Sequence, residues 1–399
     1  MSSIEKRQRG GTVSWRAHYR DPSGRQHNKS FTRRIDAERF LTGVESSKLV
    51  GAYIDPSAAR LTVGVWSERW LQGQAHLKPS TAERYAGILR EHVTPRWGTT
   101  RLADVSHADV QAWVTTLSVH RSAATVRKVH RVLSLVLALA VKDGRLVRNP
   151  AAGVSLPRVV AVERRYLTHT QVDQLAEACA APRPELVSKY RRHSERRGDD
   201  YRLVVLFLGY TGVRFGEMAA LRVRRLDLMR RRAEIVASVT VVQGRGQVWG
   251  TPKGHERRDV PIPRFLIDEL SAHVAGKGLD DLVFPGVRGG GALRVPVFRR
   301  AAFDYAAAAV GLEGLHPHEL RHTAASLAIA SGANVKVVQQ MLGHKSATMT
   351  LDQYGHLFGD QLDEVADRMD AARSAAVAQL LPTAEVIKLD EARGRNAAQ

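Results

Sequence analysis

Residues 316 to 332 read HPHELRHTAASLAIASG, and this stretch has the pattern of a helix. A proline at its second position suits a first helical turn, where no backbone N–H is needed, and Gly332 suits the end. Side chains three and four residues apart occupy neighbouring positions on one face of a helix. We therefore expect His318, Arg321 and His322 to lie together on that face.

Within this stretch, HELRH also matches H-E-x-x-H, the helical signature of zinc metalloproteases. That chemistry needs both histidines on the metal and a third ligand further along the chain. The extended signature would need glycine and histidine where the chain has Ala325 and Ala328. Arg321 would also place a cation beside the metal. A zinc hydrolase is therefore a weak interpretation.

Two other segments carry charged side chains at positions that could serve a site. In TGVRFGEMAAL (211–221), Arg214 is expected at the start of a helix with Glu217 one turn on, where the pair could also form a local ion pair. In QVWGTPKGHERRDVPIP (247–263), Lys253 is expected at the tip of a hairpin. An exposed turn lysine is ordinarily inert, but a hairpin tip can bring an ammonium group into a site.

Two segments beyond residue 332 add a histidine and a tyrosine. The predicted helix VKVVQQML (335–342) ends at a glycine, and His344 follows. Ser346 can then cap a last helix, ATMTLDQYGHLF (347–358), which presents Tyr354.

These side chains suit chemistry at a phosphodiester. Arg214 and Arg321 can each donate to non-bridging oxygens and stabilise a pentacoordinate transition state. Cationic groups of this kind do the work that metal ions do in many nucleases, so no metal is predicted.

Tyr354 can be the nucleophile of such a reaction. Because the reference pKa of tyrosine is about 10, nearby groups must assist its ionisation at neutral pH. His318 could accept its proton, His344 could hydrogen-bond the phosphate, and Lys253 could protonate the leaving 5′ oxygen.

The composition indicates a polyanionic partner. The 399 residues carry a formal net charge of +20, with 60 Lys plus Arg against 40 Asp plus Glu, which favours nucleic acid over a membrane surface. A single cysteine, Cys179, excludes an internal disulfide and a cysteine-based zinc module. The most apolar run (132–141) is too short to span a bilayer, and the start lacks the apolar core of a signal peptide. A cytoplasmic protein is expected.

Residues 1–56 read as a small sheet followed by a helix. The helical stretch RIDAERFLTGVE is expected to turn Ile35, Ala37, Phe40 and Leu41 to one side. The polar positions of the strands are largely Arg, Lys and His, so the sheet face could enter a DNA groove or could simply be solvated.

The rest of the chain divides by pattern and charge. Residues 61–157 read as helical throughout, with one helix capped by Ser106 and another running from Ala123 to Lys142. Within residues 62 to 160, 14 Lys plus Arg stand against 6 Asp plus Glu, which favours a DNA contact. Residues 165–375 form the expected large domain that carries the chemistry. Residues 376–399 form a C-terminal tail.

TGVRFGEMAAL, the TPKGHERRDVPIP hairpin, HELRHTAAS, LGH and the tyrosine ten residues beyond His344 together resemble the tyrosine recombinase family, specifically a phage-type integrase. The resemblance covers about residues 165 to 375. It implies a multidomain, mainly α protein with small β-sheets. The parts would be an arm-type DNA-binding domain with a three-stranded sheet plus helix, a helical core-type DNA-binding domain and a mixed α+β catalytic domain.

Carried over residue by residue, the resemblance implies that the catalytic positions are Arg214, Lys253, His318, Arg321, His344 and Tyr354. Glu217 matches an acidic position that supports the first arginine, and Glu319 stands where aspartate is commoner. His322 is usual beside the second arginine but is not a catalytic member of the family.

The same resemblance implies a site-specific recombinase that cuts each strand through a 3′-phosphotyrosine and integrates, and excises, a phage or other mobile element. It needs no cofactor, metal or ATP. Its partners are double-stranded DNA attachment sites of core and arm type, three further copies in a synaptic homotetramer, a host DNA-bending protein and an excisionase. Residues 360–381 read as amphipathic, with Leu362, Val365, Met369 and Ala372 on one side, and the strand-like AEVIKL (384–389) follows. This C-terminal part is expected to cover either its own core or a neighbouring protomer. The alternative from another class is a non-catalytic DNA-binding regulator.

Overall fold

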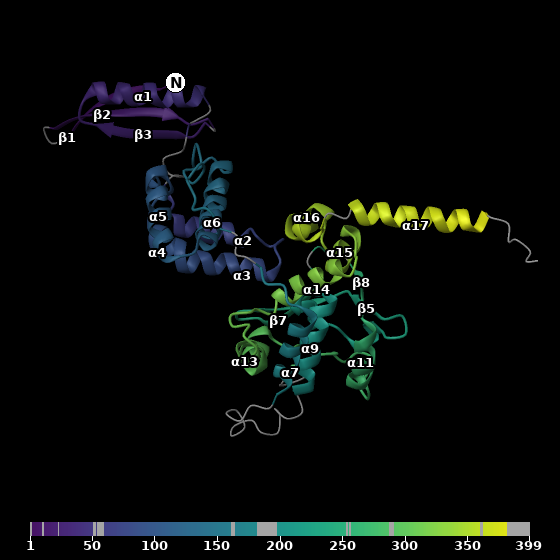
Figure 1. Ribbon diagram of the computed structural model, residues 1–399. Coiled ribbons are helices and arrows are strands. Elements are labelled where there is room, and N and C mark those ends of the chain that lie inside the picture. Colours follow the sequence, from purple (N-terminus) through teal and green to yellow (C-terminus); the bar gives the residue numbers. More distant parts are fainter. Residues whose placement is uncertain are drawn as a thin grey trace, which may run out of the picture. The chain divides into compact units, whose positions relative to one another are not determined.

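The computed structural model describes residues 2–9, 12–22, 24–50, 53, 60–160, 164–181, 198–252, 254, 257–286, 291–359 and 362–380. The chain divides into two compact units, Met1–Glu163 with Thr240–Val248 and Arg164–Val239 with Trp249–Gln399 (Figure 1).

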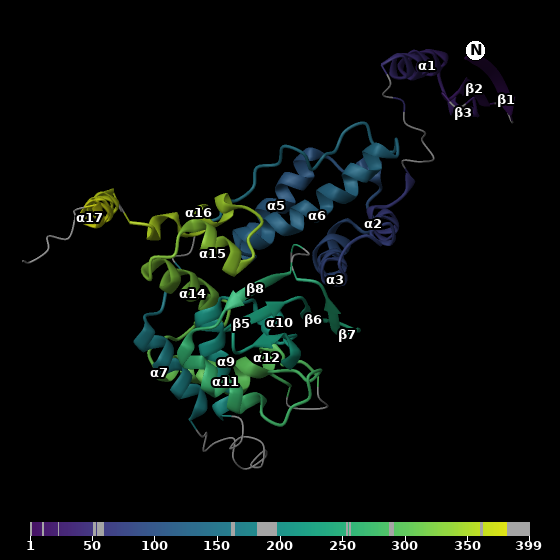
Figure 2. The same cartoon turned by 90° about the vertical axis from the view of Figure 1, so that its right-hand side faces the viewer.

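The N-terminal segment is a three-stranded antiparallel sheet with a helix against one face (Figures 1 and 2). Its elements are β1 (Ser3–Arg9), β2 (Thr12–Arg20), β3 (Gln26–Phe31) and α1 (Arg34–Leu49). Ala17 and Tyr19 alternate along β2 and are buried with Ala37, Leu41 and Val44 of α1. Because successive strand residues point to opposite faces, the side chains between them form the face turned away from the helix.

One sequence expectation for this segment is wrong. Ile35 was expected on the buried side of the helix, but its side chain is 51% exposed. The buried stripe runs through Ala37, Leu41 and Val44, spaced four and three residues apart, and Ile35 lies off that stripe. The sheet-plus-helix arrangement itself is confirmed.

The next segment is helical, as expected. Its elements are α2 (Val63–Gln72), α3 (Pro79–Ile88), a π-helical turn (Leu89–Val93), α4 (Thr94–Trp97), a 3₁₀ turn (Leu102–Asp104), α5 (His107–His120) and α6 (Ala123–Lys142). The hydroxyl of Ser106 accepts a hydrogen bond from the N–H of Asp109 at 3.1 Å, which confirms the predicted cap.

The core of this helical segment is rich in tryptophan. Trp66, Trp70 and Trp97 are all buried. The indole N–H of Trp66 donates to the carbonyl of Val136 at 3.0 Å, so the buried polar group of this large side chain is satisfied.

Two glycines allow a close backbone approach beside these tryptophans. The N–H of Gly64 in α2 donates to the carbonyl of Gly98 at 3.1 Å. A Cβ at position 64 would lie 2.7 Å from that carbonyl oxygen, so the backbone would have to move to admit it. By contrast, the nearest atom to a Cβ at Gly87 of α3 is the end of the flexible Arg90 side chain at 3.8 Å.

Gly64→Ala should therefore destabilise the helical segment by about 1–3 kcal/mol through overpacking. Gly87→Ala is the matched control and should be neutral or stabilising, because alanine is the better helix former by about 1 kcal/mol. Four of the six tryptophans lie in this segment, so urea unfolding followed by tryptophan fluorescence reports on it. Equal midpoints for the two variants would contradict the packing argument.

The remaining elements form short sheets among helices. They are α7 (His169–Ala180), α9 (Gly198–Thr211), α10 (Phe215–Met218), a 3₁₀ turn (Val223–Arg225), β4 (Leu226–Asp227), β5 (Arg232–Ile235), β6 (Ser238–Val242), β7 (Gly246–Gly250), β8 (Arg258–Pro261), a 3₁₀ turn (Arg264–Leu266), α11 (Ile267–Val274), α12 (Val295–Phe298), a π-helical turn (Arg299–Phe303), α13 (Asp304–Ala309), α14 (Glu319–Ala330), α15 (Val335–Leu342), α16 (Ala347–Tyr354), a 3₁₀ turn (Gly355–Leu357) and α17 (Leu362–Leu380).

The apolar helix α9 is the centre of the second unit. Its side chains Val204, Phe207 and Leu208 are buried, and α7 and α14 pack against it. β5 pairs antiparallel with both β4 and β8, while β6 and β7 form a hairpin. This mixture of helices and small antiparallel sheets confirms the expected fold class.

The helices that carry the candidate residues begin and end close to where the sequence places them. α15 ends at Gly343, whose φ of 65° is left-handed, and the Ser346 hydroxyl accepts from the N–H of Met349 at 3.2 Å to cap α16. One detail differs. α14 begins at Glu319, so the preceding proline lies outside the helix and His318 is its N-cap residue.

The side chains of α17 whose burial the structure describes are all exposed. Val365 is 47% exposed and Met369 is 69% exposed, so the apolar side predicted from the sequence is not covered by this chain's own core. The strand-like residues 384–389 lie outside the described part of the chain. None of the helices within the described ranges is long and apolar enough to cross a membrane.

Candidate active site

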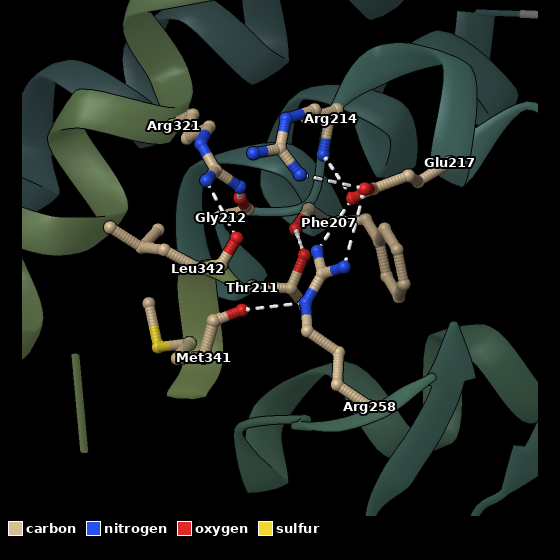
Figure 3. Close-up of polar contacts among 9 residues, drawn as sticks. All are labelled: Phe207, Thr211, Gly212, Arg214, Glu217, Arg258, Arg321, Met341 and Leu342. Carbon is tan, nitrogen blue, oxygen red and sulfur yellow. Dashed lines mark hydrogen bonds and ion pairs between the residues drawn. The ribbon is translucent and has the colours of Figure 1, made fainter. Parts of the chain in front are cut away.

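A buried carboxylate joins two arginines at the start of α10 (Figure 3). Glu217 is 1% exposed. Its two oxygens accept from the N–H and the guanidinium of Arg214, each at 2.9 Å. The same oxygens accept from Nη1 and Nη2 of Arg258 at 3.2 and 2.5 Å. The carboxylate therefore ties the N-terminus of α10 to strand β8.

The charge of Glu217 is stabilised by these contacts. Burial by itself raises the pKa of a carboxyl group, because it penalises the charged form. The hydrogen bond and charge of Arg258, with those of Arg214, outweigh burial and hold the pKa of Glu217 below its ordinary value. Glu217 is therefore ionised at neutral pH and fixes both guanidinium groups.

Arg321 is held by backbone carbonyls. Arg321 is 4% exposed, and its guanidinium donates to the carbonyls of Gly212 and Leu342, each at 2.6 Å (Figure 3). Gly212 has a φ of 65°, and a Cβ there would lie 2.8 Å from Leu342, so glycine is required for this approach.

The buried charge of Arg321 has no carboxylate partner within ion-pairing distance among the residues that the structure describes. Burial, and then the neighbouring cation Arg214, lower the pKa of Arg321 to about 9. It stays protonated at pH 7. A buried cation that is solvated only by carbonyls would be stabilised by an anionic ligand.

Tyr354 lies in the same site, and its hydroxyl contacts a histidine. Its side chain is fully buried, and the hydroxyl is 2.7 Å from Nδ1 of His322. The ring of His344 is parallel to the Tyr354 ring within 5° at 6.3 Å, and its Nδ1 is 3.0 Å from the hydroxyl of Thr350. The rings of His318 and His322 meet edge to face at 5.3 Å.

All three histidines have pKa values below the ordinary range. Burial, and then Arg164, lower the pKa of His322 to about 4. Burial, and then Arg321, lower the pKa of His344 to about 4 and that of His318 in the same direction. Burial also raises the pKa of Tyr354. At neutral pH these histidines are therefore neutral beside a protonated tyrosine.

The structure brings five of the expected site residues and their supporting carboxylate into one region. They are Arg214, His318, Arg321, His344 and Tyr354, with Glu217. Lys253 lies outside the described residues. The histidine that contacts the Tyr354 hydroxyl is His322, whereas the sequence interpretation expected His318 in that place.

Arg258 is a functional candidate that the sequence interpretation missed. A signal was present, because Arg258 and the buried Val260 alternate along β8 and so share a face. A charged side chain on the inward face of a strand needs a buried partner, which is Glu217. Nε of Arg258 also donates to the carbonyl of Met341 at 3.1 Å.

The zinc interpretation does not fit this arrangement. A zinc site would require both histidines of H-E-x-x-H on one turn of a helix, but His318 precedes α14. Nδ1 of His322 contacts the hydroxyl of Tyr354 at 2.7 Å. No group of three or more His, Cys, Asp or Glu within the described ranges could hold a metal ion.

Comparison with known proteins identifies two family matches. The chain matches the Phage integrase family over residues 165–360 and the Phage integrase central domain over residues 64–156. A relative from Mycobacterium tuberculosis H37Rv, whose name describes a prophage phiRv2 integrase, is 29% identical over 368 residues, which cover 88% of this chain and 91% of the relative.

Solved structures share the fold. The Tn1549 transposon integrase in complex with a circular intermediate DNA has a TM-score of 0.61 at 19% identity and covers 78% of this chain and 99% of its own. A lambda integrase dimer bound to a COC′ core site has a TM-score of 0.53 at 18% identity, covering 90% and 95%. A lambda integrase tetramer bound to a Holliday junction has a TM-score of 0.50 at 18% identity, covering 86% and 96%.

Glu217→Gln should destabilise the protein by about 3 kcal/mol or more, because it leaves two poorly solvated guanidinium groups without a counter-charge. The pKa of Glu217 is lowered on folding. The ionised carboxylate therefore stabilises the folded protein fully above the unfolded-state pKa of 4.5, and this stabilisation is lost as pH falls through the lower folded-state pKa. The difference from wild type in unfolding free energy should therefore be largest near pH 7 and shrink below pH 4.5.

Asp280→Asn is the matched control. Asp280 pairs with Arg224 at 2.9 Å, but both side chains are largely exposed, so its loss should change stability by less than about 1 kcal/mol. Chemical denaturation of both variants between pH 3 and 7 measures the two effects. A Glu217→Gln variant as stable as the control at pH 7 would contradict the structural role of this carboxylate.

Proposed function

Because this chain belongs to the tyrosine recombinase family as a phage-type integrase, we propose a specific assignment of its active-site residues. The protein is a site-specific recombinase, an enzyme that cuts and rejoins DNA. In the proposed assignment, Arg214 and Arg321 bind the scissile phosphate, and Tyr354 attacks it to form a 3′-phosphotyrosine with a free 5′-hydroxyl.

The observation that carries this assignment is the buried guanidinium of Arg321. It is fixed by two carbonyls, and no carboxylate among the described residues lies within ion-pairing distance of it. A diester anion would provide the missing counter-charge at that place, in contact with donors that are already oriented. The buried nucleophile Tyr354 lies in the same site, and its pKa responds to the charge of Arg321.

The other residues receive supporting roles. His344 hydrogen-bonds the phosphate, and its own ring is held by Thr350. Glu217 positions Arg214 and Arg258, which keeps the first phosphate ligand oriented. Lys253 protonates the leaving 5′ oxygen. Each strand exchange conserves the number of phosphodiester bonds, so neither metal nor ATP is required.

The proposed partners follow from the same family. Residues 61–157 and 165–375 bind the core-type attachment site, while residues 1–56 bind arm-type DNA. Four protomers assemble on two duplexes, and the exposed apolar side of α17, with the tail 376–399, packs on a neighbouring protomer. A host DNA-bending protein and an excisionase set the direction of integration and excision of a phage or other mobile element in the bacterial cytoplasm.

The N-terminal sheet offers a basic face for the arm-type contact. Arg16 and Arg20 of β2 alternate with the buried residues Ala17 and Tyr19 and therefore point away from α1. Lys29 of β3 lies on the opposite face, where its ammonium group is 4.8 Å from the ring of Phe40. The outward-facing arginines are thus on the other side of the sheet from Lys29, which covers the core of this segment.

Tyr354→Phe should abolish covalent capture of DNA while leaving DNA binding intact. The test uses a nicked duplex from the junction between the element and the chromosome, incubated in EDTA, with the covalent protein–DNA adduct detected on a denaturing gel. A non-catalytic regulator would form no adduct even as wild type. Wild-type activity that EDTA abolishes and zinc restores would overturn the assignment in favour of a zinc hydrolase.

The double variant Arg16→Ala/Arg20→Ala should lose affinity for arm-type DNA but keep cleavage at the core site. A plot of the logarithm of the binding constant against the logarithm of salt concentration has a negative slope. If each arginine contacts a phosphate, the magnitude of that slope should decrease by up to about 2 in the variant. Arg39→Ala, which changes an exposed arginine on α1, is the matched control. Fluorescence anisotropy over a salt series measures the slope, and equal slopes for both variants would reject the sheet as the DNA-binding face.

A further inference from the structure

The hydroxyl of Tyr354 is not free in the folded site. Nδ1 of His322 lies 2.7 Å from it, and the tyrosine ring is fully buried and parallel to His344. The hydroxyl oxygen is the atom that would attack phosphorus. His322 is therefore the side chain in direct contact with the reacting atom before DNA enters, although the family resemblance assigns it no catalytic role.

We propose that His322 acts as a catalytic residue, which aligns the Tyr354 hydroxyl for attack and accepts its proton through Nδ1. This inference rests on the proposed nucleophilic role of Tyr354. In the attack step the O–H bond of Tyr354 breaks as an Nδ1–H bond forms on His322. The tyrosine oxygen bonds to phosphorus, the bond from phosphorus to the 5′ oxygen breaks, and Lys253 protonates that oxygen. Religation reverses each transfer.

The surroundings of His322 favour this role. The side chain is neutral at pH 7, and in the tautomer that carries its proton on Nε2, Nδ1 has a lone pair that accepts a hydrogen bond and a proton. After burial, the causes of its low pKa are the cations Arg164 and Arg321 with the neighbouring rings of His318 and His344. A bound diester brings a negative charge among these groups, which raises the pKa of His322 toward the range of a useful base.

His318 is placed for a different task. It precedes α14, and its ring meets the ring of His322 edge to face, while the contact to the tyrosine hydroxyl is made by His322. It therefore supports the orientation of His322 as a positioning residue. The proton acceptor lies one helical turn further along, next to the phosphate-binding Arg321.

Two variants separate alignment from proton transfer. His322→Leu removes both, whereas the amide oxygen of His322→Asn can replace Nδ1 as hydrogen-bond acceptor but is not a base. His169→Leu is the matched control, because Nδ1 of His169 makes the same type of contact, 2.8 Å from the hydroxyl of Tyr210, away from the nucleophile.

The measurement is the single-turnover rate of covalent adduct formation with saturating enzyme. Each variant is assayed on the nicked core duplex and on the same duplex with sulfur in place of the bridging 5′ oxygen. A thiolate leaves without protonation, so the sulfur substrate rescues defects on the leaving-group side only. Affinity for the uncleaved core duplex, measured by anisotropy, reports whether each variant is folded.

His322→Leu should slow adduct formation by about 10²–10⁴-fold on both substrates, the range of general acid–base catalysis, with duplex affinity unchanged. His322→Asn should lie between His322→Leu and wild type, and His169→Leu should match wild type. A rate for His322→Leu within about threefold of wild type would overturn the proposal. So would rescue of His322→Leu by the sulfur substrate, because His322 would then act on the leaving group.

The Asn variant tests the two halves of the proposal separately. If His322→Asn forms the adduct at the wild-type rate, proton transfer to His322 is rejected. If it forms the adduct at the rate of His322→Leu, alignment of the hydroxyl by His322 is rejected. If wild-type protein forms no adduct at all, the assignment of Tyr354 as nucleophile fails first, which is a distinct outcome.

Discussion

The site depends on one buried carboxylate. Glu217 receives hydrogen bonds from Arg214 and Arg258 at the same pair of oxygens, and through them it connects α10 with β8. The cost of burying an ion is met only when several donors surround it. These contacts hold two guanidinium groups in fixed directions, and the proposed phosphate-binding site is built around them.

A second set of contacts holds Arg321 near the same carboxylate. It is fixed by the carbonyls of Gly212 and Leu342, two residues that end helices α9 and α15 or follow them directly. The last carbonyls of a helix have no partner within it, so they can accept from an outside donor. Helix ends thus orient the cation without neutralising it, and its charge remains for an anionic ligand.

These two constraints explain why the site can be formed before DNA arrives. Donors that are already oriented need no rearrangement when charge develops on the phosphate, which is the main source of electrostatic catalysis. The proposed nucleophile is also positioned in advance, because Tyr354 is buried against His344 and its hydroxyl contacts His322. In the proposed function, the basic N-terminal segments would then need only to bring the scissile phosphate to this place.

The sequence by itself determined the fold class, the caps at Ser106 and Ser346, the end of α15 at Gly343 and the family. These features depend on local patterns, such as hydrophobic spacing, capping residues and short motifs, which can be read within a few residues of the chain. Only the tertiary structure decided that Arg258 binds Glu217 and that His322 contacts Tyr354. Those partners lie 41 and 32 residues apart, and no local spacing relates them. Their contact depends on how β8, α10, α14 and α16 pack, and it is set by the need to give each buried polar group a partner.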